Sequence, residues 1–389
     1  MATDIVDITI LLPAYNEAEG IASVIRDIRA SLENRYEIIV VDDGSTDATA
    51  AVAKEHGCRV IQYGKNRGKG FALRAGAAFA RGRFLIVMDA DGTYPADAIP
   101  DIVKLLAECD MVRCRRHESR EYIPPINRIG NLIFDKMLAF IHGLEGPDHL
   151  SGLYGFRLDA FRKLDLKAQG FDIEAEIGVK VQKRGLSVKT YPIEYRPRLG
   201  LKKLRPWRDG WVIFNRIFSL AILFNPFIFF IVPSILLLLS AMTGAFFLSR
   251  GPIITPYFGL SIHSFILANL GILGAFQLLI FGITTTLYGI EFGQKTPAWL
   301  RYFTAKPLRI IAAFAGFTIL LGGIVYLAVI VWGWMMSGAG YFFDTSKLVF
   351  AGTYVVWGLQ IMSAALFLTI FSVRISGKHN GIPDIQELS

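Results

Sequence analysis

Four long apolar runs in the second half of the sequence constrain the fold more than any other feature. They extend over about residues 227–248, 262–288, 310–336 and 348–372. A hydrocarbon core about 30 Å thick is crossed by roughly 20 apolar residues in an α-helix, so each run is long enough to span a bilayer. The sequence therefore predicts an all-α transmembrane domain of four helices over residues 226–373.

Lysine and arginine are distributed unevenly between the segments that connect these runs. Segment 291–309 contains four of them and segment 374–389 contains two, whereas loops 249–261 and 337–347 contain one each. Because basic loops stay on the cytoplasmic side of a membrane, we expect a multi-pass protein of the cell membrane. Its N-terminal half, its middle loop and a tail over 374–389 would lie in the cytoplasm.

Polar residues inside the four runs are few. They include Gln277, Thr284 to Thr286 and Gln360. An ion pathway through a membrane needs more polar or ionisable groups than this, so the pattern disfavours a transporter.

The N-terminal half, residues 1–207, has a different pattern and carries most of the charge. Five strand-like runs are found at Ile8–Leu12, Glu37–Val41, Arg59–Tyr63, Phe84–Met88 and Met111–Cys114. Amphipathic helical stretches separate them, near 17–32, 47–56, 69–80 and 96–108. This alternation predicts an α/β domain with a doubly wound, mostly parallel sheet. Ligands of such sheets bind outside the carboxyl ends of the strands.

Two carboxylates follow the fourth strand-like run. In the stretch RFLIVMDADGTYP, residues 83–95, the apolar run leads into Asp89 and Asp91. If the backbone stays extended beyond Met88, both side chains project to the same side, where they suit a divalent cation that holds a phosphorylated ligand. Asp-Gly is also common in turns, so a simple turn is the alternative.

Polar residues also follow the first three strand-like runs, in PAYNE (13–17), DDGS (42–45) and GKNRGKG (64–70). The alternatives here are helix capping, by Asn16 and by Ser45 or Asp47, and a solvated loop at 64–70. The glycine loop lacks the spacing and the Ser or Thr of a Walker A motif, and no GxGxxG follows the first strand. A P-loop and a dinucleotide-binding site are therefore disfavoured.

Taken together, these motifs resemble the inverting nucleotide-sugar glycosyltransferases of GT-A fold. The resemblance rests on PAYNE (13–17), VVDDGS (40–45), GKG (68–70) and MDADG (88–92). Further motifs resemble the polyprenyl-phosphate branch, which includes dolichyl-phosphate mannose synthases and glucosyltransferases: RIGN (128–131), DHLSG (148–152), FDIEAE (171–176) and RLGLKKL (198–204). The resemblance covers about residues 8–204.

The resemblance implies roles for individual residues. Those expected to bind the donor nucleotide sugar are Pro13, Tyr15, Glu17, Asp42, Lys69, Asp89, Asp91, Arg198 and Lys203. Asp89 and Asp91 would be catalytic and hold Mg²⁺ or Mn²⁺ against the diphosphate, whose charge the ion neutralises. Arg116, Arg128 and Ser151 would meet the acceptor phosphate. Asp148 would orient or deprotonate the acceptor; the alternative is a loop or N-cap aspartate.

Two basic segments lead into amphipathic stretches. Residues 113–128 precede a stretch at 129–144, and residues 196–208 precede an aromatic stretch within 208–225. A solvated basic face is the alternative, but we predict two interfacial helices whose basic ends meet lipid phosphate. No nucleic-acid-binding motif accompanies the basic segments, so we expect membrane lipids and not nucleic acid as the partner.

The sequence thus predicts an inverting, metal-dependent transfer of a hexose to dolichyl or polyprenyl phosphate, which supplies a lipid-linked sugar for protein glycosylation or cell-surface glycans. GDP-mannose is the expected donor and UDP-glucose the alternative. A processive polysaccharide synthase is disfavoured because no QxxRW-like element follows Glu176 in the N-terminal half. A noncatalytic membrane scaffold is disfavoured because Asp42, Asp89, Asp91 and Arg198 are intact.

Overall fold

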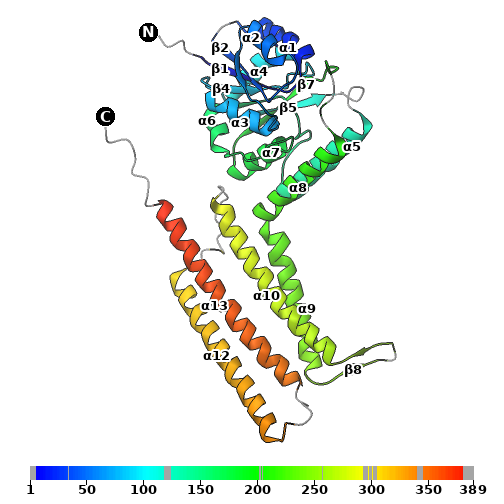
Figure 1. The fold of residues 1–389 in the computed structure, drawn as a ribbon, viewed down its shortest axis with the longest axis vertical. Helices are drawn as coiled ribbons and strands as arrows, with labels where there is room; N and C mark the ends of the chain where they lie inside the picture. The colour runs from blue at the N-terminus through cyan, green and yellow to red at the C-terminus, as the bar shows by residue number, and fades with distance from the viewer. Residues whose placement is uncertain are drawn as a thin grey trace, which may run out of the picture. The chain divides into compact units, whose positions relative to one another are not determined.

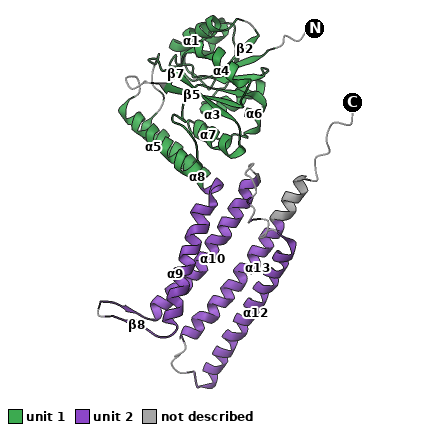
Figure 2. Cartoon of the chain, turned by 180° about the vertical axis from the view of Figure 1, so that it is seen from behind, with its two compact units in different colours: residues 1–221 green, residues 222–389 purple. Residues whose placement is uncertain are grey.

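The chain divides into two compact units, residues 1–221 and 222–389 (Figure 2). The computed structural model describes residues 6–33, 35–117, 124–200, 203, 205–255, 257–291, 297, 300, 305–339 and 345–379, with only the backbone at 117, 291 and 371–379. The segment predicted as a separate interfacial helix at 208–225 forms most of α8 (Pro206–Phe224) and lies largely in the first unit.

A seven-stranded sheet organises the first unit, in the order β3–β2–β1–β4–β6–β5–β7. Its strands are β1 (Ile8–Ala14), β2 (Tyr36–Asp42), β3 (Arg59–Gln62), β4 (Phe84–Val87), β5 (Met111–His117), β6 (Tyr154–Arg157) and β7 (Val188–Glu194). Only β6 is antiparallel to its neighbours. The predicted mostly parallel sheet is confirmed, although β6 and β7 were not foreseen.

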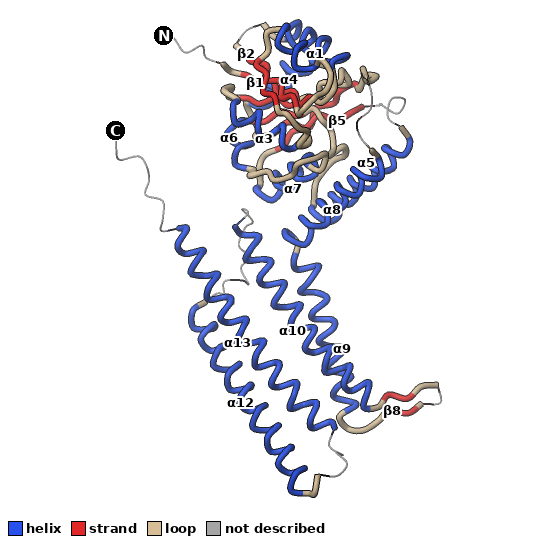
Figure 3. Tube along the Cα trace, viewed as in Figure 1, coloured by secondary structure: helices blue, strands red, loops and turns tan. Residues whose placement is uncertain are grey.

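Helices cover both faces of this sheet (Figures 1 and 3). The helices of this unit before α8 are α1 (Ala18–Ser31), α2 (Thr49–Glu55), α3 (Lys69–Phe79), α4 (Ile99–Leu106, after a short 3₁₀ turn at Ala96–Ala98), α5 (Pro125–His142), α6 (Leu158–Lys163) and α7 (Ile173–Arg184). Helices α1, α2 and α4 pack on one face, and α3, α6 and α7 on the other. The doubly wound arrangement is therefore confirmed.

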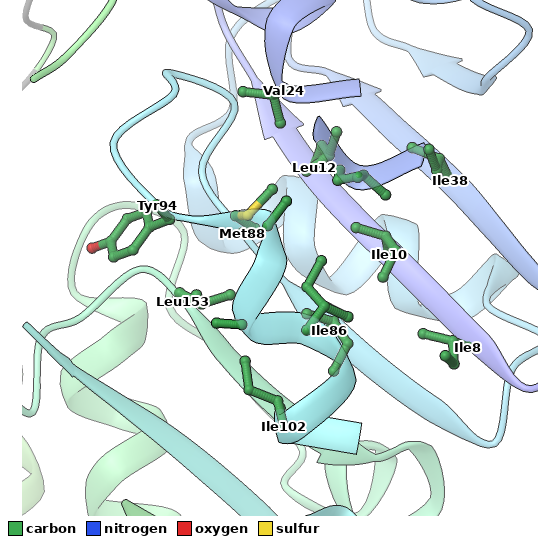
Figure 4. Packing of buried hydrophobic residues seen from close by; sticks show 14 of the residues in the cluster. Ile8, Ile10, Leu12, Val24, Ile38, Ile86, Met88, Tyr94, Ile102 and Leu153 are labelled. Atoms are coloured by element: carbon green, nitrogen blue, oxygen red, sulfur yellow. The ribbon is translucent and has the colours of Figure 1, made fainter. Parts of the chain in front are cut away.

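The alternation of side chains along β1 and β4 builds both halves of the core. Ile10 and Leu12 point into one cluster, which Figure 4 shows together with Ile86 and Met88. Leu11, between them in the chain, points into the other cluster. A strand buried on both faces is continuously apolar for this reason, and the polar residues are left for the strand ends.

Helices α5 and α8 each bury some apolar side chains and expose others. Ile129 and Phe140 of α5 are exposed, as are Trp207 and Trp211 of α8. The ring of His142, at the end of α5, lies 3.2 Å from the carbonyl oxygen of Ile217 in α8. The predicted amphipathic stretch at 129–144 is thus a helix, which begins four residues earlier, at Pro125.

The second unit consists mainly of long apolar helices. Among its described residues are a π-helical turn (Phe227–Ile231), α9 (Val232–Leu248), the hairpin strands β8 (Ile253–Ile254) and β9 (Gly259–Leu260), α10 (Ile262–Glu291), α12 (Lys306–Met336) and α13 (Thr345–His379). Four helical segments in the described part of the chain are long and apolar enough to cross a membrane: Phe227–Leu248, Ile262–Ile290, Lys306–Met336 and Thr345–Ile370.

The basic residues used to predict the orientation lie partly in helices. Arg309 is in the first turns of α12 rather than in a loop, and Arg374 is in α13, which continues to His379. A helix need not stop where its apolar run stops, since its backbone hydrogen bonds do not depend on apolar side chains. Lys295, Arg301 and residues 380–389 of the predicted tail lie outside the described residues.

Candidate active site

A cavity of about 1810 Å³ lies at the carboxyl ends of the parallel strands in the first unit. Nine of the residues predicted to bind donor or acceptor line it: Pro13, Tyr15, Glu17, Lys69, Asp89, Asp91, Arg116, Arg198 and Lys203. Apolar side chains of α5 and α8 line it as well, among them Ile129, Ile133, Trp211 and Phe214. A charged cluster and an apolar surface thus share one cavity.

Asp89 is held by an ion pair. The Lys69 ammonium lies 2.6 Å from Asp89 Oδ1 and 2.7 Å from Glu174 Oε1. Burial alone would lower the pKa of Lys69, but these two carboxylates raise it well above its usual value. Lys69, at the start of α3, is therefore a cation shared between two acidic side chains.

Asp91 is held in a parallel way. Arg198 Nη1 donates to Asp91 Oδ2 at 2.6 Å, and Arg198 Nη2 donates to Glu17. Burial raises the pKa of Glu17 to about 7, although the Arg198 charge opposes the shift. The pKa of Asp91 is also raised, by burial and by the Asp89 charge. Lys203 Nζ donates to the Asn16 carbonyl at 2.7 Å, which brings a further cation to the same cavity.

The backbone does not stay extended beyond Met88, so the reason given for pairing Asp89 with Asp91 was wrong. Strand β4 ends at Val87, and a turn begins at Ala90. Asp91 Oδ1 accepts from the backbone NH of Thr93 at 3.0 Å, which stabilises the turn. The turn alternative is therefore correct for the backbone, and the turn still presents both carboxylates to the cavity.

Asp148 does not line the cavity; its carboxylate engages Arg116, which does. Arg116 Nε lies 3.0 Å from Asp148 Oδ2, and the Arg116 backbone NH donates to the same oxygen at 2.8 Å. Asp135 accepts from the backbone NH of Asp148 at 2.9 Å. The geometry favours the orientation of Arg116 over proton abstraction as the role of Asp148.

Three further predicted residues lie away from the cavity lining. Asp42 is fully buried and accepts from the Ser45 backbone NH at 3.0 Å. Its neighbour Asp43 lines the cavity instead. Arg128 is exposed on α5, and the Ser151 side chain is buried beside a separate small void. The structure therefore brings Arg116, but not Arg128 or Ser151, to the cavity.

Two side chains that line the cavity, Asp43 and Tyr195, were missed because their position depends on the fold. Asp43 accepts from the backbone NH groups of Arg67 and Gly68, at 2.9 and 2.6 Å, and so holds the glycine loop. The period-two rule could have separated it from Asp42, because adjacent strand residues face opposite sides. The aromatic ring of Tyr195, after β7, lies 5.4 Å from the Arg116 guanidinium. Since β7 was not predicted, no sequence signal placed this ring.

Comparison with known proteins agrees with this geometry. The family described as glycosyl transferase family 2 matches residues 9–165. The low-salt glycan biosynthesis hexosyltransferase Agl6 of Haloferax volcanii is 29% identical over 93% of this chain and 88% of that protein. A dolichyl-phosphate hexose transferase of the same organism is 30% identical, over 53% of this chain and 90% of its own length.

A shorter stretch is similar to a dolichyl-phosphate beta-glucosyltransferase of Drosophila melanogaster, with 43% identity over 25% of this chain and 34% of that protein. The family match lies within the first unit, which contains the mostly parallel sheet. The chain is therefore a glycosyltransferase with a GT-A catalytic fold, and it belongs to glycosyl transferase family 2.

Proposed function

We propose that the chain transfers a hexose from a nucleotide diphosphate sugar to dolichyl or another polyprenyl phosphate, with inversion at the sugar. The observation that carries this proposal is the shared cavity, where Asp89, Asp91 and Arg198 lie together with apolar side chains of α5 and α8. A polyprenyl phosphate has a charged head and a long apolar chain, and the cavity offers a surface for each.

The donor diphosphate would be held by Arg198, Lys203 and a divalent cation. No cluster of three potential metal-ligating side chains is found in the described part of the chain. Mg²⁺ bound to a phosphorylated substrate needs only one or two carboxylates, because phosphate oxygens and water complete its shell. Asp89 and Asp91 fit this requirement. When bound, Mg²⁺ or Mn²⁺ would neutralise the charge that develops on the departing diphosphate.

The acceptor phosphate would pair with Arg116, whose planar guanidinium suits phosphate oxygens. Asp148 fixes one edge of that guanidinium through two hydrogen bonds from Nε and Nη2. A phosphate monoester is already ionised near neutral pH, so its oxygen attacks without a strong general base. The chain would then act mainly by orienting the two substrates and screening their charges.

The exposed apolar faces of α5 and α8 support a place for both helices in the membrane interface. The four apolar helical segments of the second unit would span the membrane. With the basic segments on the cytoplasmic side, the catalytic unit would face the cytoplasm. The product would be a lipid-linked hexose, used as a sugar donor for protein glycosylation or surface glycans.

Two donors remain in the proposal. GDP-mannose is the donor expected from the resemblance, and the similarity to a protein named dolichyl-phosphate beta-glucosyltransferase supports UDP-glucose. Purified full-length protein would be incubated with dolichyl phosphate and each labelled donor, with Mg²⁺ or Mn²⁺ present. We expect one donor to give a labelled lipid with a single hexose. A labelled polymer would support a processive synthase, and no product from either donor would support a scaffold.

A further inference from the structure

The glycine loop before α3 is shaped to approach another backbone segment closely. A Cβ on Gly68 would lie 2.3 Å from the Gln169 carbonyl oxygen, and one on Gly70 would lie 2.4 Å from that of Ala168. The Phe71 backbone NH also donates to the Gln169 oxygen at 3.2 Å. The two glycines therefore let the start of α3 dock on the segment that leads into α7.

This docking brings Lys69, between the two glycines, next to Glu174 in the first turn of α7. The Lys69 and Glu174 side chains are 11% and 6% exposed, and the ammonium also contacts Asp89 Oδ1. On the other side of Asp89, its Oδ2 faces Gly152, where a Cβ would lie only 2.2 Å away. The Asp89 carboxylate is thus held from both sides.

A lysine paired with Asp89 alone would neutralise the carboxylate and compete with a cation for it. Because Glu174 shares the same ammonium, the three ionised side chains together carry a net charge of about −1. Arg198 is shared in the same way between Asp91 and Glu17. With Asp89, Glu174, Asp91 and Glu17 all ionised, these carboxylates together with Lys69 and Arg198 have a net charge of about −2, which a divalent cation balances.

We propose that Glu174 is a positioning residue that keeps Lys69 between two carboxylates and so preserves the negative charge of Asp89 for a divalent cation. This inference rests on the metal-dependent form of the proposed function. It assigns a role to the glycine loop as well, because the loop delivers Lys69 to Glu174.

Mn²⁺ binding to the full-length protein in detergent, without donor or acceptor, tests this role by calorimetry. Glu174→Gln should weaken Mn²⁺ binding about 10- to 100-fold, as loss of a partner behind a metal ligand commonly does. The double variant Lys69→Met/Glu174→Gln should bind to within about threefold of wild type, because it restores the net charge beside Asp89. A purely structural role for Glu174 predicts that the double variant binds no better than the single one.

Glu37→Gln provides the matched control. Glu37 is another buried glutamate in an ion pair, with Arg81, and it does not line the cavity. This variant should bind Mn²⁺ as wild type does. If Glu174→Gln fails to fold, Lys69→Met alone should still bind Mn²⁺ more tightly than wild type, and equal or weaker binding overturns the inference.

The outcomes separate the inference from the function on which it rests. Wild-type protein that binds Mn²⁺, together with a folded Glu174→Gln variant that binds equally well, overturns the role of Glu174 alone. Wild-type protein that binds neither Mn²⁺ nor Mg²⁺ overturns the metal-dependent function and this inference with it.

Discussion

The two units stabilise their interiors in opposite ways. In the first unit, buried acidic and basic side chains are shared in groups of three, as Lys69 is between Asp89 and Glu174. In the second unit, by contrast, uncharged side chains form hydrogen bonds between helices. For example, the Gln360 amide donates to Gln277 Oε1 at 3.4 Å. Charge is concentrated where we place the chemistry, whereas the apolar helices depend on close backbone packing.

Glycines provide that packing between α12 and α13. A Cβ on Gly358 would lie 2.4 Å from the Leu320 backbone nitrogen, and one on Gly316 would lie 2.8 Å from the Met362 nitrogen. Helices in lipid associate through such small residues, because apolar side chains gain little by leaving apolar lipid. Variants that remove the charged groups of the first-unit cavity should therefore change activity, and variants at these glycines should change stability.

The largest effect is expected for Asp91→Asn. The substitution removes a charge that faces both Arg198 and the proposed cation, so hexose transfer should fall on the order of a thousandfold. The melting temperature should stay close to that of wild type. Asp110→Asn is the control for the transfer assays, because Asp110 accepts from the Ser187 backbone NH and does not line the cavity. Normal transfer by Asp91→Asn would remove the metal argument.

Gly152→Ala should have the next largest effect. The added Cβ would lie 2.2 Å from Asp89 Oδ2, so the carboxylate must move, and a shift of about 1 Å can reduce the rate roughly a hundredfold. Gly64→Ala is the matched control, because a Cβ there meets nothing within 4 Å. Initial rates of the two variants can be compared directly. Equal rates would show that Asp89 does not need its observed position.

In the second unit, Gly358→Ala should lower stability without altering nucleotide binding by the first unit. The crowded Cβ would push α12 and α13 apart, at a cost of about 1–3 kcal/mol in unfolding free energy. Gly352→Ala, in the same helix but with nothing within 4 Å, should be close to neutral. Thermal unfolding in detergent measures both. Similar melting temperatures for the two variants would contradict close packing at Gly358.

The smallest effect concerns His142, in the contact between α5 and α8. Burial lowers the pKa of His142 to about 4, and Lys183 also disfavours its charged form. The unfolded chain binds the proton more readily, so stability should fall as pH drops from about 6.5 towards 4. The loss between pH 7 and 5 is about 2 kcal/mol at most. Unfolding at each pH should show a smaller loss for His142→Gln, and an identical loss would refute the assignment.

Much of the first unit could be predicted from sequence because β1, β2 and β4 are buried on both faces. Their apolar runs were long enough to identify. Because ligands bind at the carboxyl ends of such strands, the sequence then predicted that Glu17, Asp89 and Asp91 lie close together. Strand β6 has only four residues, one of them Gly155, and β7, at the sheet edge, is exposed at every second position. Neither has the apolar run that made the other strands recognisable.

The site was harder to predict where a residue acts through another. The motif around Asp148 suggested a role at the acceptor. In the structure Asp148 contacts Arg116 of β5, which lies 32 positions earlier in the chain, and only the fold brings the two together. The separation between Lys69 and Glu174 is larger still. Sequence spacing cannot reveal such pairs, because the fold alone brings their elements together.

The most direct test of the account is metal-dependent transfer to a lipid phosphate. Full-length protein would be treated with a chelator, mixed with dolichyl phosphate and labelled GDP-mannose or UDP-glucose, and assayed before and after Mn²⁺ is restored. The account predicts a labelled lipid from one donor only after the metal returns. The same yield in the presence of the chelator, or no lipid product after Mn²⁺ or Mg²⁺ is added, would contradict it.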